Sequence, residues 1–88
     1  PEIIIQIRAH TDSRGLEDFN LNLSQKRANS SMNWLLGKGI HKDRVFAVGF
    51  GESELVNGCK SFVKCSDEKH QENRRTEFVI LNPVVIGR

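Results

Sequence analysis

The segment HTDSRGLEDFNLNLSQKR, residues 10–27, separates two stretches of regular hydrophobic pattern and organises the rest of the chain. Residues 2–9 before it are rich in β-branched side chains, and their apolar and polar positions alternate, which predicts a β-strand. Turn-forming residues dominate the first part of the segment, so we expect residues 11–22 to form a loop. An amphipathic stretch at residues 28–36 then predicts a helix.

The sequence predicts both ends of this helix and the face that it buries. We expect it to begin near Leu23 or Ser24, with Asn22 or Ser24 as its N-cap. It should end at the glycines of residues 37–39, after which Ile40 can pack back against the last turn. Residues at helical spacing mark the buried face: Ala28, Ser31, Met32 and Leu35.

Three further elements are predicted in the second half of the chain. Residues 44–50 (RVFAVGF) are apolar on both faces, which indicates a buried strand. A long polar loop at residues 52–66 carries both cysteines and is followed by a short helix at residues 67–74. Residues 76–81 (TEFVIL) predict the last strand.

The order of elements predicts an α+β fold, an α/β sandwich in which helices cover one face of a mixed sheet. The first strand, the helix and the second strand should form a right-handed parallel crossover. We expect one domain over residues 1–88, with residues 2–81 as its folded part and residues 82–88 as a tail. Because the chain begins abruptly at Pro1, on the threshold of a strand, we expect it to be a piece of a longer protein.

Composition narrows the class of function. The net charge of +2 comes from basic residues scattered among acidic ones, which does not favour nucleic acid as a partner. No apolar run is long enough to span a bilayer, so we expect a soluble segment that does not insert into membranes. Cys59 and Cys65 could form a disulfide in an oxidising compartment, or remain thiols or bind metal in the cytosol.

Asp12 and Arg27 are the candidate binding residues at the two edges of the loop. Asp12 follows the first strand at its carboxyl end, where sheets with crossover helices bind ligands. Lys26 and Arg27 would fall in the first turn of the predicted helix, where the helix dipole disfavours a cation. Because functional residues often occupy locally unfavourable positions, this placement favours a binding role. A carboxylate opposite a guanidinium predicts a two-charge clamp for a zwitterionic ligand. The alternative is that Asp12 caps the loop and Arg27 is a solvated cation.

Four sequence blocks, in order, resemble the OmpA-like peptidoglycan-binding domain. They are HTD with a nearby glycine (residues 10–15), NLNLSQKRA (20–28), VGFGE (48–52) and NRR (73–75). With the strand that ends in HTD and the strand that follows NRR, the resemblance covers roughly residues 5–81. Outer-membrane barrel proteins, lipoproteins and flagellar stator proteins carry this domain. The resemblance implies a binding module of βαβ(α)β topology, with no enzymatic activity and no cofactor.

The resemblance also implies what the module binds. It implies non-covalent capture of peptidoglycan through the diaminopimelate of the stem peptide, on the periplasmic side of the outer membrane. Asp12 and Arg27 match the charged clamp of the family. Further ligand-binding positions that the resemblance implies are Thr11, Asn20, Leu21 and Arg74. It also implies a Cys59–Cys65 disulfide. The alternative function is a domain that binds another envelope protein.

Two departures from the family pattern change the expectations. Ala9 stands where many members have glycine, which could shift the loop slightly. The first strand and helix of the family have no counterpart in this sequence, so we expect a weakened pocket and self-association through a sheet edge. His10 could be catalytic or metal-binding, but we expect a loop histidine with hydrogen-bonded neighbours. Cys59, Cys65 and His70 could supply three zinc ligands, but their spacing fits no standard zinc pattern.

Overall fold

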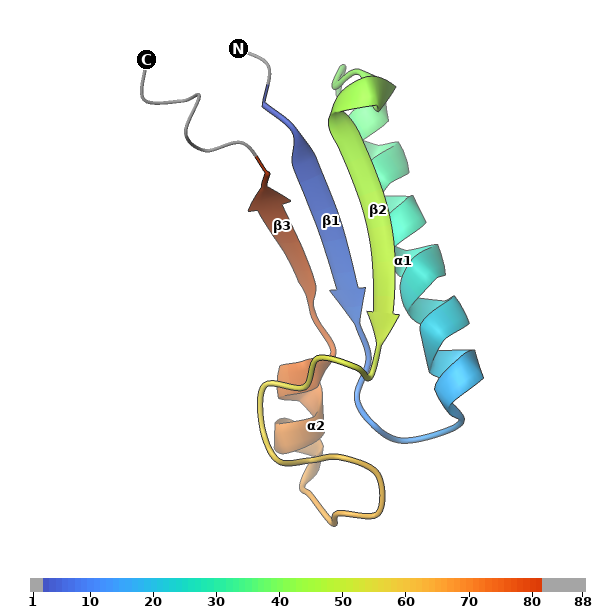
Figure 1. Cartoon of the computed structure of the whole chain (residues 1–88), viewed down its shortest axis with the longest axis vertical. Helices are drawn as coiled ribbons and strands as arrows, with labels where there is room; N and C mark the ends of the chain where they lie inside the picture. The colour runs from blue at the N-terminus through green and yellow to red at the C-terminus, as the bar shows by residue number, and fades with distance from the viewer. Residues whose placement is uncertain (1–2, 82–88) are drawn as a thin grey trace.

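The computed structural model describes residues 3–81 and contains a three-stranded mixed sheet with two α-helices (Figure 1). The strands lie in the order β2-β1-β3, with β1 parallel to β2 and antiparallel to β3. The elements are β1 (Ile5–His10), α1 (Glu17–Gly37), the 3-10 turn η1 (Lys42–Arg44), β2 (Val45–Gly51), α2 (Asp67–Asn73) and β3 (Thr76–Ile80). The predicted α+β class and the parallel strand–helix–strand unit are confirmed.

The core lies between α1 and one face of the sheet. Its buried members are Ile7, Ala9, Ala28 and Val45, and the partly buried side chains around them are Ile5, Met32, Leu35, Ile40 and Ala47. Helix α2 lies beyond the ends of the strands and not over the sheet (Figure 1). In the described part of the chain a single helix therefore covers the sheet.

Because one helix covers one face of the sheet, side chains on the other face are exposed to solvent. We predicted that residues 44–50 would be buried on both faces, but Phe46 is 51% exposed, so that prediction is wrong. Residue 46 belongs to the face of β2 that points away from α1, because its neighbours Val45 and Ala47 pack into the core. Strands β2 and β3 form the two edges of the sheet. Self-association through an edge stays a prediction.

Helix α1 begins six residues earlier than Leu23. Its N-cap is Leu16, whose side chain makes no capping hydrogen bond, and the first turn holds the carboxylates of Glu17 and Asp18, which the dipole favours there. Asn20 and Leu21, predicted in the loop, are therefore helical. The predicted first-turn position of Lys26 and Arg27 is wrong, since both lie in the third turn.

The end of α1 agrees with the sequence pattern. The helix ends at Gly37, and Gly39 has a φ of 99°, a conformation that glycine adopts without strain. The backbone N–H of Ile40 donates to the carbonyl of Leu35 at 3.2 Å, and the Ile40 side chain packs against the core. The predicted glycine-terminated end is confirmed.

Gly49 and Gly51 explain how closely α1 lies on β2. A Cβ at Gly49 would lie 2.3 Å from the backbone nitrogen of Gln25, which no real contact permits. Gln25 uses this proximity, because its side chain donates to the carbonyl of Ala47 at 3.0 Å and accepts from the N–H of Gly49 at 2.9 Å. Ser24 is not a cap but a tertiary contact, whose hydroxyl accepts from the N–H of Gly51 at 2.8 Å.

Candidate functional site

Asp12 lies two residues beyond the end of β1, and its carboxylate is held by two arginines. Its side chain is 9% exposed, and Oδ1 accepts from the backbone N–H of Arg14 at 2.9 Å. Oδ2 accepts from the guanidinium of Arg14 at 2.9 Å and from Nη1 of Arg74 at 2.6 Å. We call Asp12, Arg14 and Arg74 the charged cluster.

The charged cluster keeps Asp12 ionised. Burial raises the pKa of the Asp12 carboxyl, but the hydrogen bonds from the Arg14 side chain and backbone and from Arg74 outweigh it. Together they lower the pKa from 3.8 to about 2. The side chains of Arg14 and Arg74 are 51% and 31% exposed, so a ligand can reach the cluster from solvent.

Thr11 and Asn20 fix the backbone that carries Asp12. Both are buried, and the Thr11 hydroxyl donates to the carbonyl of Asp12 at 2.9 Å. The Asn20 amide donates to the carbonyl of Arg14 at 2.9 Å, to the carboxylate of Glu52 at 3.1 Å and to the carbonyl of Asp12 at 3.3 Å. The first turn of α1 is thereby tied to the loop after β1 and to the end of β2.

Arg27 is separated from the charged cluster. It is seven residues, or two helical turns, beyond Asn20, which is about 10 Å along the axis of α1. The side chain is exposed, and among the described residues it makes no ion pair or hydrogen bond. Residues two positions apart on a helix point about 200° apart, so Arg27 lies on the flank of α1 opposite Gln25. The Gln25 side chain contacts β2, and β1 and β3 follow β2 in the sheet. Arg27 is therefore on the flank of α1 toward β1 and β3. Thr11, Asp12, Asn20 and Arg74 come together in the structure, and Arg27 stands apart.

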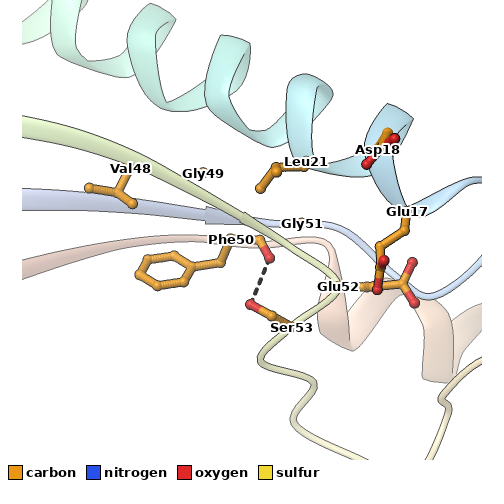
Figure 2. A pocket seen from close by; sticks show the side chains of 9 residues that line it. All are labelled: Glu17, Asp18, Leu21, Val48, Gly49, Phe50, Gly51, Glu52 and Ser53. Carbon is orange, nitrogen blue, oxygen red and sulfur yellow. Dashed lines mark hydrogen bonds between the residues drawn. The ribbon is translucent and has the colours of Figure 1, made fainter.

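Leu21 lines a separate hollow between α1 and the end of β2 (Figure 2). The hollow has a volume of about 380 Å³. Its apolar wall includes Leu21, Val48 and Phe50, and the carboxylates of Glu17 and Glu52 lie together at its other end (Figure 2). Because Glu52 also accepts from the Asn20 amide, the hollow is next to the charged cluster but does not contain Asp12.

The loop after β2 is closed by a disulfide and fixed on α2. The Cys59–Cys65 disulfide is present, which confirms that prediction and excludes a zinc site that needs both thiolates. Asn73 is fully buried, accepts from the N–H of Val56 at 2.7 Å and donates to Asn57 at 2.9 Å. The Ser13 hydroxyl donates to the carbonyl of Cys59, so the disulfide loop is also joined to the segment that carries Asp12.

His10 is the last residue of β1 and is buried under neighbouring side chains. Its ring stacks on Phe50 with centroids 5.4 Å apart, and its Nε2 lies 2.9 Å from a carboxylate oxygen of Glu77. This hydrogen bond lowers the pKa of Glu77. A hydrogen-bonded structural histidine, and not a catalytic one, fits these contacts.

Sequence reasoning missed Arg14, Glu52, Asn57 and Asn73 as parts of this region. Arg14 lies two residues after Asp12, and a basic residue so close to a loop carboxylate in sequence indicates an ion pair between the two. Glu52 and Asn73 fall inside the VGFGE and NRR blocks, but only the fold shows that one contacts Asn20 and the other holds the disulfide loop.

The family pattern, a lipoprotein relative and a solved structure point to one family. The sequence pattern of the OmpA family matches residues 1–74. The chain is 36% identical over 76 residues to the peptidoglycan-associated lipoprotein of Buchnera aphidicola subsp. Baizongia pistaciae, covering 85% of this chain and 40% of that protein. It is 35% identical over 82 residues to the photosystem I P700 chlorophyll a apoprotein A2 of Gloeobacter violaceus, covering 92% of this chain and 9% of that protein.

A solved structure has the same fold. The crystal structure of the peptidoglycan-associated lipoprotein from Burkholderia pseudomallei matches with a TM-score of 0.80 and 30% identity, covering 91% of this chain and 64% of that one. The matched region is 40% of the Buchnera lipoprotein and 9% of the Gloeobacter protein, so the chain spans less than half the length of both sequence relatives. No helix within residues 3–81 is long and apolar enough to cross a membrane.

Proposed function

The chain belongs to the OmpA family, and we propose that it binds peptidoglycan non-covalently through the diaminopimelate of the stem peptide. In this proposal it attaches an outer-membrane protein or envelope complex to the cell wall from the periplasmic side. OmpA-like domains are non-enzymatic modules that associate with peptidoglycan in general, so the prediction of a binding module and not an enzyme is confirmed.

The charged cluster is the observation that carries the proposal. The side-chain end of diaminopimelate bears an ammonium and a carboxylate, so its receptor needs both signs of charge. Asp12 offers a carboxylate that stays ionised down to about pH 2, and Arg14 and Arg74 stand beside it. An incoming ammonium replaces one guanidinium at Oδ2 of Asp12, and the released guanidinium can then take the ligand carboxylate.

Arg27 supplies a second cation along the length of α1. A ligand that reaches from Asp12 toward the flank of α1 facing β1 and β3 meets the Arg27 guanidinium, which has no described protein partner to compete. Because Arg27 is exposed, the ion pair that it makes is weakened by solvent, and we expect the affinity to be modest.

Thr11, Asn20 and Leu21 have supporting roles in this proposal. Thr11 and Asn20 hold the backbone of Asp12 and Arg14 in place before the ligand arrives. Such pre-organisation lowers the entropy that binding must overcome. Leu21 gives an apolar wall next to the charged groups.

Sedimentation with purified sacculi tests the proposal. We expect the wild-type chain to sediment, Asp12→Asn to remain in solution, and Arg27→Ala to be retained less. Lys26→Ala is the matched control, because Lys26 is the exposed cation next to Arg27 but points about 100° away around the helix. Retention of Arg27→Ala and Asp12→Asn at the wild-type level would contradict the assignment.

A protein-binding role is the second candidate, and two exposed aromatic side chains favour it. Phe46 and Phe78 are each more than half exposed. They lie on opposite faces of the sheet, because Phe78 pairs with the core residue Ile7 and Phe46 pairs with Gln6. Large exposed apolar side chains are enriched at protein interfaces. Under this alternative, Phe46→Ser or Phe78→Ser, according to which face binds, would abolish capture of an envelope partner and leave sedimentation with sacculi unchanged.

A further inference from the structure

A second cavity lies next to the charged cluster, on the side of the disulfide loop. Its volume is about 310 Å³, within the size range of small-molecule sites. The cavity is formed by the segment after β1, the disulfide loop and α2, and its lining residues are Ser13, Arg14, Gly15, Ser61, Phe62, Val63 and His70. Arg14 belongs to both this cavity and the charged cluster, so the two are contiguous.

Phe62 on the rim of the cavity is unusual in two respects. Its side chain is fully exposed, and its φ of 69° is the only positive value among the non-glycine residues that the structure describes. Both features cost free energy, since an aromatic ring gains by burial and a side chain disfavours left-handed backbone. Phe62 is held in this conformation inside the ring that the Cys59–Cys65 disulfide closes. Strain of this kind concentrates where a segment is shaped for binding.

His70 gives the cavity a polar group that lacks a partner. The residue is 5% exposed, and within the described residues its Nδ1 is buried without a hydrogen bond. A buried polar atom left unsatisfied is unfavourable, so a ligand that reaches it gains a hydrogen bond which the protein alone does not make.

The charges around the cavity favour a neutral ligand. The Arg14 guanidinium is paired with Asp12 at 2.9 Å and with Asp67 at 3.3 Å, so its charge is already balanced. The two lysines of the disulfide loop, Lys60 and Lys64, do not line the cavity. A flat aromatic face, hydroxyl groups and one imidazole suit a ring with apolar C–H faces and hydroxyl or amide edges, which describes a pyranose sugar.

We propose that this cavity is a glycan subsite, which takes one N-acetylated pyranose ring of the peptidoglycan strand. The ring stacks on Phe62, and a hydroxyl or acetamido group bonds to His70. The inference rests on the proposed function, because the stem peptide bound at the charged cluster is attached to the same glycan. Arg14 lies between the two groups of contacts and brings peptide and sugar into one continuous site.

Two soluble fragments of peptidoglycan test the subsite. One is the stem peptide released by an amidase, and the other is the disaccharide-peptide released by a muramidase. We expect calorimetric titration to show that the disaccharide-peptide binds about three- to tenfold more tightly than the free peptide, the value of one aromatic stacking contact. In Phe62→Ala this difference should disappear while the affinity for the free peptide is unchanged. Phe46→Ala, which removes an exposed phenylalanine from the sheet, is the matched control.

The outcomes separate the subsite from the proposed function. Equal affinities of the wild-type chain for both fragments would overturn the subsite and leave peptide binding intact. An equal loss of both affinities in Phe62→Ala would also overturn it, because Phe62 would then serve the peptide. If neither fragment binds, the proposed function fails and the subsite fails with it. In NMR spectra, the imidazole signals of His70 should shift with the disaccharide-peptide and not with the free peptide.

Discussion

Replacing Asp12 by asparagine removes one charge from the centre of the charged cluster and changes little else. The substitution keeps the size and planarity of the side chain, but an amide cannot accept two charge-assisted hydrogen bonds from guanidiniums as a carboxylate does. Arg14 and Arg74 are partly exposed, so water can replace part of what they lose. The variant should therefore fold, with a reduced free energy of unfolding.

The lowered pKa of Asp12 sets the size and the pH range of the effect. A carboxyl whose pKa falls from 3.8 in the unfolded chain to about 2 in the folded chain stabilises the folded state by about 2 kcal/mol. Because the folded pKa is the lower one, this contribution is complete above about pH 5 and is lost as the pH falls from about 4 to 2. Asp12→Asn should therefore cost about 2 kcal/mol at pH 7 and only a small part of that at pH 2, where about half of the folded-state carboxyls are still ionised.

Urea unfolding followed by circular dichroism between pH 2 and pH 7 measures this difference. The wild-type and Asp12→Asn curves of unfolding free energy against pH should converge as the pH decreases. Asp43→Asn is the control, because it removes one carboxylate whose side chain is 78% exposed, where solvent weakens charge interactions. Parallel wild-type and Asp12→Asn curves would refute the reasoning, since Asp12 would then titrate alike in both states.

Three further outcomes are expected, each measured by urea unfolding at pH 7. Gly49→Ala should lose about 3 kcal/mol or fail to fold, because its Cβ would meet the Gln25 backbone, and wild-type stability would contradict the close packing of α1 on β2. Ser24→Ala should lose about 1–2 kcal/mol, because the buried N–H of Gly51 loses its acceptor; no loss would mean that water replaces the hydroxyl. Reducing the Cys59–Cys65 disulfide should cost about 2 kcal/mol, as its short loop predicts, and an unchanged midpoint would contradict that estimate.

The sequence contained enough information for the class of fold and for one end of α1. Alternation along β1 places Ile7 and Ala9 on one face of the strand, because successive side chains of a strand point to opposite faces, and that face packs against the helix. The predicted start of α1 is wrong, because a polar N-cap indicates a later start, whereas the helix begins after Leu16 with acidic residues in its first turn. That error moved Asn20 into the loop and Arg27 to the helix terminus.

The candidate site could be predicted less completely. Asp12 and Arg74 are 62 positions apart, and no local pattern indicates that their side chains meet. Gln25 was missed because its tertiary hydrogen bonds depend on the absence of a side chain at Gly49. The family blocks made Asp12, Asn20 and Arg74 candidates, but only the fold showed that Arg14 and Arg74 both bind the Asp12 carboxylate. It also showed that Arg27 lies two helical turns beyond Asn20.

The binding of two matched stem peptides tests the central claim most directly. One peptide carries diaminopimelate and the other carries lysine, which has the same side-chain ammonium but lacks the adjacent carboxylate. If opposite charges on the protein bind a zwitterion, the wild-type chain should bind the diaminopimelate peptide about tenfold more tightly, and Arg27→Ala should reduce that preference without abolishing it. Equal affinity of the wild-type chain for both peptides would contradict the account.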